Sequence, residues 1–273
     1  MKIYKIADAP FRTFGLEDMV FDSFMRHYKN ITHPQYLAEN QKYLNRNMAA
    51  IIGSTNIRNY VAKIIEHYGK PKSPIPYQME LAIISPKHPD AKKFSALMQH
   101  DQGKFEMSVV LRSPKITDLD VSRLKEHIGH ELEHFLKAVY RGTDSYYNRG
   151  EKELKQWDAP VDKKPEEYWS NYREIQAYGK EWAIELIAEY ENIYRIRTKN
   201  IPNKTVIDSM ENSKEKIIRS MVAFKVKNLL NSIERIMGKP LLPEIRKAYY
   251  IATMKGFSTL FDEFINRKKN ELV

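Results

Sequence analysis

The sequence predicts an α+β protein, in which a domain with a small sheet is followed by a helical C-terminal region. Three observations support this prediction. Apolar residues recur at intervals of three and four along most of the chain, as they do in amphipathic helices. Two segments between residues 77 and 113 are instead rich in residues typical of strands. The elements follow the order helices, strands, helices, which favours a segregated arrangement over an alternating one.

The first part of the chain is predicted to be helical over residues 16–69. The segments "LEDMVFDSFMRHY" and "NIRNYVAKIIEHYG" both show helical spacing of apolar residues, and Gly69 is a plausible helix end. The proline-rich stretch "KPKSPIP", residues 70–76, then predicts a connector.

A small mixed sheet is predicted at about residues 77–113. Its two candidate strands are "YQMELAII" (77–84) and "GKFEMSVVLRS" (103–113), and Pro86 and Pro114 follow them. The segment between the strands predicts one short helix within a loop.

Two long helices are predicted next, at 118–141 and 171–196. The first begins at "TDLD" (117–120), where Thr117 as N-cap and Asp120 resemble a capping box, and Gly142 ends it. The segment 142–170 between the helices is long for a loop, and such loops are often functional.

The rest of the chain predicts a separate helical region. The stretch "TKNIPNKT" (198–205) indicates a boundary, and two helices broken at "GKPLLP" follow it. We therefore expect one domain over residues 1–197 and a helical region over 205–273.

The composition is that of a folded chain without thiol chemistry. The 273 residues are 42% hydrophobic and 29% charged, so the chain can bury a core. Cysteine is absent, so any metal must be held by His, Asp or Glu. The N-terminus lacks the apolar core of a signal peptide, and no apolar run has the length of a membrane span. These features predict a soluble, cytoplasmic protein.

The net charge of +10 permits an acidic partner such as nucleic acid. The basic residues are dispersed, however, and many alternate with Glu and Asp. A nucleic-acid footprint requires clustering on one face, so a solvated basic surface is the favoured interpretation. A basic, DNA-associated protein remains an alternative.

The helix over 118–141 contains the sequence His130-Glu131-Leu132-Glu133-His134, which has the form H-E-x-x-H. Residues four apart lie about 40° apart on a helix, so the two histidines project together. On this helix they lie at the edge of an apolar stripe that we expect to be buried. The stripe consists of Leu124, Ile128, Leu132, Phe135, Leu136 and Val139. The opposite face, with Glu126, Glu133 and Lys137, is expected to face solvent.

Two imidazoles at this spacing can bind one zinc ion, and the intervening Glu131 can reach a metal-bound water. A catalytic zinc uses three protein ligands and keeps one position for water. Glu174, near the start of the helix over 171–196, is the candidate third ligand. Ala177, one turn later, leaves room for a neighbouring helix to approach.

The pattern H-E-x-x-H followed by E-x-x-A on a later helix resembles the gluzincin branch of zinc metallopeptidases. The fragment "YWSNYREIQAYGKEW" also resembles small metallopeptidase-like proteins of bacteria and phages. The resemblance covers about residues 103–190. It implies a zincin-like catalytic domain, a zinc ion held by His130, His134 and Glu174, and Glu131 as general base. It also implies that the strand "FEMSVVLR" is the sheet edge that pairs with an extended peptide substrate.

The chain departs from that family in two respects. Glu174 lies 40 residues after His134, which is a longer gap than is typical. There is also no histidine downstream of His134, which excludes the metzincin pattern and removes a common oxyanion donor. A tyrosine must then serve as donor, and Tyr168, Tyr172 and Tyr178 are candidates, with Tyr168 preferred.

Three further residues near the motif have weaker interpretations. His127 is either a helix-surface residue or an accessory to the metal, and we favour the former. Glu181 is either an exposed glutamate or a hydrogen-bond partner of a ligating imidazole. Glu133 is expected to be a solvated charge.

The favoured function is a zinc-dependent peptidase acting on a protein or peptide substrate, with no membrane partner. A zincin-like binding or structural module with weak or absent peptidase activity is a second alternative, because the downstream histidine is missing.

Overall fold

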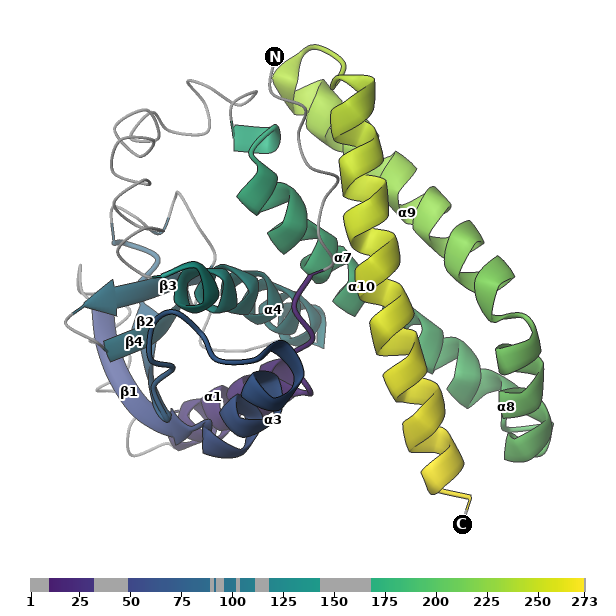
Figure 1. Cartoon of the computed structure of the whole chain (residues 1–273), viewed down its shortest axis with the longest axis horizontal. Helices are drawn as coiled ribbons and strands as arrows, with labels where there is room; N and C mark the ends of the chain where they lie inside the picture. The colour runs from purple at the N-terminus through teal and green to yellow at the C-terminus, as the bar shows by residue number, and fades with distance from the viewer. Residues whose placement is uncertain are drawn as a thin grey trace. The chain divides into compact units, whose positions relative to one another are not determined.

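The computed structural model describes residues 10–31, 49–88, 91, 96–101, 104–110, 118–142 and 168–272 (Figure 1). The chain forms two compact units. We call Thr13–Lys163 the sheet unit, and Met1–Arg12 with Lys164–Val273 the helical unit. This division differs from the boundary expected at 198–205, because the helix over Tyr172–Arg197 shares its core with the helices that follow it.

The sheet unit has an α+β architecture, as the sequence predicts. Its elements are α1 (Leu16–Ile31), β1 (Ala49–Asn56), α3 (Arg58–Tyr68), β2 (Gln78–Ile84), β3 (Ala96–Asp101), β4 (Lys104–Val110) and α4 (Asp118–Arg141). The strands form one mixed sheet in the order β1-β2-β4-β3 (Figure 1). β1 pairs antiparallel with β2, β2 pairs parallel with β4, and β3 pairs antiparallel with β4.

Two of the four strands were not predicted. The segment 16–69 is not helical throughout, because β1 lies within it and pairs with β2. The segment between the two predicted strands contains β3, which pairs with β4, where a short helix was expected. Short apolar runs do not distinguish a strand from a buried helix, and pairing with a neighbouring strand then decides the outcome.

β1 contains a bulge between Ile51 and Gly53, where the register with β2 shifts. At this point the ring of His27, on α1, lies against Gly53. A Cβ atom on Gly53 would be 2.4 Å from the His27 ring, so any larger residue would displace that ring. The missing side chain at Gly53 therefore allows α1 to pack closely on the first strand.

The predicted apolar stripe of α4 is buried in the sheet unit. Every one of its six residues is at most 6% exposed. Phe135 meets Phe105 of β4 edge to face, with ring centroids 4.6 Å apart. Near the C-terminal end of α4, the Tyr140 hydroxyl shares its one hydrogen between the carbonyls of Gly69 and Ile64, 3.0 and 3.2 Å away, which fixes the end of α3 to α4.

The opposite face of α4 is also buried, so the prediction that it faces solvent is wrong. Glu126, Glu133 and Lys137 are 8%, 0% and 3% exposed. Lys137 Nζ lies 3.1 Å from Glu133 Oε1, as an ion pair and not an aligned hydrogen bond. Polar side chains four apart usually indicate a solvated face, but here Glu133 and Lys137 are buried together as an ion pair.

The helical unit consists of α7 (Tyr172–Arg197), α8 (Asn203–Asn212), α9 (Lys214–Met237) and α10 (Pro243–Asn270). The break predicted at "GKPLLP" is confirmed, since Gly238 ends α9 in a left-handed conformation. Within the part of the chain that the structure describes, no helix combines the length and apolar character needed to cross a membrane.

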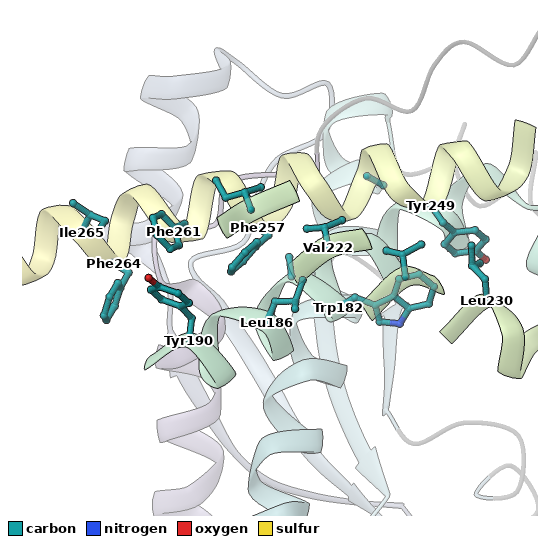
Figure 2. Packing of buried hydrophobic residues seen from close by; sticks show 14 of the residues in the cluster. Trp182, Leu186, Tyr190, Val222, Leu230, Tyr249, Phe257, Phe261, Phe264 and Ile265 are labelled. Atoms are coloured by element: carbon teal, nitrogen blue, oxygen red, sulfur yellow. The ribbon is translucent and has the colours of Figure 1, made fainter. Parts of the chain in front are cut away.

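The core of the helical unit is aromatic where α7 meets α10 (Figure 2). Trp182 stacks on Tyr249, with ring centroids 5.1 Å apart, and Tyr190 packs on Phe261. The two helices approach most closely at Gly179, where a Cβ atom would lie 2.6 Å from the Cβ of Ala252. The absence of a side chain at Gly179 therefore sets the separation of α7 and α10.

Candidate metal centre

His130 and His134 lie one turn apart on α4, and their Nε2 atoms are 3.2 Å apart. His130 is 7% exposed and His134 is half-buried, so the pair lies at the edge of the buried region. Two ligands of a tetrahedral zinc ion, each about 2.0–2.1 Å from the metal, lie about 3.3 Å apart. The spacing of the two imidazole nitrogens therefore fits one shared metal ion.

The local sequence explains why both rings point the same way. The i, i+4 spacing places the histidines on one side of α4, and the stripe that packs on the sheet fixes the rotation of the helix. The rings meet at 65° with centroids 5.0 Å apart. Each of the two imidazoles can offer one uncharged nitrogen to a metal, and imidazole nitrogen is a common zinc ligand.

Glu131, between the histidines, is half-buried. One of its carboxylate oxygens, Oε2, accepts a hydrogen bond of 2.9 Å from the backbone N–H of Met98 on β3. The carboxylate thus lies beside the strand at the edge of the sheet. A carboxylate in this place is able to accept a proton from a water molecule near the histidines.

Glu174, the candidate third ligand, lies in the first turn of α7 and is 5% exposed. The helix begins at the N-cap Asn171, whose side chain accepts a 2.8 Å hydrogen bond from the Arg173 N–H. A carboxylate in the first turn is favoured by the positive end of the helix dipole. Glu174 belongs to the helical unit and the histidines to the sheet unit, so its role as the third ligand belongs to the proposal below.

A pair of tyrosine hydroxyls leads to Glu174. Tyr168 hydrogen-bonds to the Glu174 carboxylate, and its hydroxyl lies 3.0 Å from that of Tyr178. Burial, followed by the negative charge of Glu174, raises the pKa of Tyr168 far above its ordinary value, so Tyr168 keeps its proton. Since a tyrosine has one hydrogen to donate, Tyr168 donates to Glu174 and receives the hydrogen bond from Tyr178.

The remaining predicted residues fall in different places. His127 and Glu181 are both half-buried, on α4 and α7, and Tyr178 is half-buried as well. The side chain of Tyr172 lies outside the described residues, as do Thr117 and most of the loop 142–170.

One predicted role is corrected. The segment "FEMSVVLR" was expected to form the sheet edge, but β4, which contains most of it, lies between β2 and β3. The edge next to it is β3, which the sequence did not predict. The only sequence sign of β3 is the apolar pair Leu97 and Met98, which is too short to distinguish from a helix segment.

Comparison with known proteins adds no relative: no family model matches the chain, and neither a curated protein nor a solved structure matches it. The resemblance to gluzincins therefore depends on the motif residues alone.

Proposed function

We propose that the protein is a zinc-dependent peptidase of the zincin type. His130, His134 and Glu174 are the proposed ligands, two imidazoles and one carboxylate, which is a donor set suited to zinc. The main support is the 3.2 Å spacing of the two Nε2 atoms, which suits a shared tetrahedral ion. The mixed sheet with α4 packed against it is compatible with a zincin-like domain.

In this proposal Glu131 is the general base. A bound zinc ion would supply an activated water and polarise the scissile carbonyl. Glu131 adjoins both histidines in sequence and accepts the water proton on a carboxylate oxygen. It then transfers that proton to the departing amine, so the carboxylate returns to its ionised state.

We infer that Tyr168 positions Glu174. Its hydroxyl donates a hydrogen bond to this carboxylate, and such a bond orients a carboxylate ligand toward a metal. The sequence-based preference for Tyr168 as oxyanion donor stays a prediction. It requires the hydroxyl to leave Glu174 during the reaction.

The test is metal analysis of the protein expressed with ample zinc. The wild type is expected to contain about one zinc per chain, and His130→Ala to contain almost none. His127→Ala is the control, because it removes a different histidine, half-buried and three residues earlier on the same helix. Equal zinc content in both variants, or none in the wild type, contradicts the proposed site.

Glu131→Gln tests the chemistry separately from the metal. This variant should keep its zinc and lose peptide cleavage by about a hundredfold or more, since the amide is not a base. If the wild type holds zinc but cleaves no better than Glu131→Gln across a broad peptide library, the alternative of a zinc-holding binding module is supported instead.

A further inference from the structure

The free edge of the sheet carries an unusual hydrogen bond. β3 is the last strand in the order β1-β2-β4-β3, and no further strand pairs with it among the described residues. Backbone N–H groups along such a strand alternate between its neighbour and the outside. The N–H of Met98 donates to Glu131 on α4, so it is one of the outward-pointing groups.

Both partners of this hydrogen bond, strand β3 and the Glu131 carboxylate, belong to elements that pack in the core. Met98 pairs with Met107 of β4, and its side chain is 6% exposed, so the strand is anchored by the core. Glu131 follows His130 on a helix whose stripe is fully buried against the sheet. The hydrogen bond of 2.9 Å therefore joins two rigid elements, α4 and β3.

We propose that the Met98 N–H is shared between Glu131 and an extended peptide substrate. Without a peptide, the N–H holds the Glu131 carboxylate at the edge of β3. A peptide that adds to β3 as a new strand offers a backbone carbonyl to the same N–H. Glu131 then loses this partner and turns to the water. Occupation of the edge strand thus changes the hydrogen bonding of the proposed base.

The assignment of Glu131 as a base rests on the proposed function, but the competition for the Met98 N–H does not. That competition involves one donor and two acceptors, a side-chain carboxylate and a peptide carbonyl. It can be measured without zinc and without cleavage. Met98 is thus a positioning residue that acts through its backbone.

The first measurement is hydrogen exchange of the Met98 amide by NMR on the full chain. Glu131→Ala removes the acceptor, whereas Glu131→Gln keeps an acceptor oxygen of similar reach. We expect exchange at Met98 to be roughly tenfold faster in Glu131→Ala than in the wild type, with Glu131→Gln close to the wild type. The Met107 amide on β4 is the internal reference and should not change.

Two results of this measurement overturn the proposal. If Met98 exchanges equally in all three proteins, Glu131 does not protect its N–H. If Met98 and Met107 accelerate together, the substitution loosens the sheet and the effect is not specific to one hydrogen bond.

The second measurement is binding of a peptide to the edge strand. The probe is an acetylated and amidated hexapeptide of alternating valine and threonine, which favours the extended conformation. Its Kd is obtained from the Met98 amide shift in Glu131→Ala and Glu131→Gln, neither of which has a base. We expect Glu131→Ala to bind several-fold more tightly, because no side chain competes for the N–H.

Equal affinity of the two variants rejects the competition, and absence of binding at millimolar peptide rejects the edge as a peptide site. These failures are distinct from failure of the proposed function. If the protein holds zinc but the Met98 amide is unprotected, only the present inference is refuted. If the amide is protected but no zinc is bound, only the peptidase proposal is refuted.

Discussion

α4 and α10 are both long, deeply buried helices, but they bury different chemistry. α4 encloses an ion pair, a histidine and a further glutamate together with its apolar stripe. α10 buries large aromatic residues and small ones, and Thr253 is the one polar residue on it that is buried. α10 is thus stabilised mainly by apolar packing, whereas α4 accepts the cost of buried charge. α7 of the helical unit also buries charged side chains, since Glu174 and Lys180 are 5% and 2% exposed.

The comparison is tested most strongly by the ion pair on α4. Lys137→Met leaves the Glu133 carboxylate buried next to an apolar side chain, and we expect a loss of about 3–5 kcal/mol in unfolding free energy. Replacing both residues, as Glu133→Gln with Lys137→Met, should recover most of that loss because no buried charge remains. Urea unfolding monitored by circular dichroism measures both.

The control is a partly exposed ion pair in the helical unit. Lys225 bonds to Glu185, with side chains 15% and 31% exposed. Lys225→Met should cost less than about 1 kcal/mol, because water can solvate the remaining carboxylate. Similar losses at Lys137 and Lys225 would show that burial does not make the ion pair on α4 different from a partly exposed one.

An intermediate effect is expected where α7 and α10 are closest. Gly179→Ala places a methyl group 2.6 Å from the Ala252 Cβ, so the helices must separate. We expect a loss of about 1–3 kcal/mol in unfolding free energy. Adding Ala252→Gly removes the opposing methyl and should restore part of the loss. On a helix surface with free space, replacing glycine by alanine usually stabilises a protein. If Gly179→Ala alone were more stable than the wild type, contact at this position would not set the distance between α7 and α10.

The smallest effect is expected at Glu234 of the helical unit. Its carboxylate accepts hydrogen bonds from Arg246 and from the Leu241 N–H. The bond from Arg246 is the main cause that lowers the pKa of Glu234 below its usual value of 4.5. The group therefore stabilises the fold above the unfolded pKa, and this contribution is lost as the pH falls through the lower folded pKa.

Glu234→Gln should therefore be less stable than the wild type at pH 7, by less than about 1 kcal/mol. The difference should shrink as the pH is lowered below 4.5. Thermal unfolding of both proteins across this pH range provides the measurement. A difference that grows in acid would mean that Glu234 acts through something other than its charge.

The sequence predicts the long helices well and the short strands poorly. The helix expected at 118–141 coincides with α4, because its apolar stripe repeats over about four turns and Gly142 ends the helix. β1 and β3 escape prediction because each is a short run whose strand identity comes from pairing with β2 or β4. Local residues do not specify such pairing.

The candidate site is predictable to a similar degree. The i, i+4 histidines and Glu131 follow from the motif, because helix geometry alone brings the two rings together. The bond from Met98 to Glu131 does not, since it joins residues 33 positions apart through a backbone group. The burial of Glu133 and Lys137 could not be predicted from the spacing of apolar residues either. That spacing identifies the apolar face of a helix but not whether its polar face is covered.

The aromatic cluster at the start of α7 gives the protein an intrinsic optical reporter. The Trp169 ring lies 4.9 Å from that of Tyr178, whose hydroxyl lies 3.0 Å from that of Tyr168, the partner of Glu174. Only three tryptophans are present, and Trp182 is locked in a stack with Tyr249. In a Trp157→Phe background, emission would come from Trp169 and Trp182, and both report on this cluster because the Trp182 ring also lies 6.0 Å from that of Tyr178. Fluorescence can then follow events at Glu174 in real time without any attached dye.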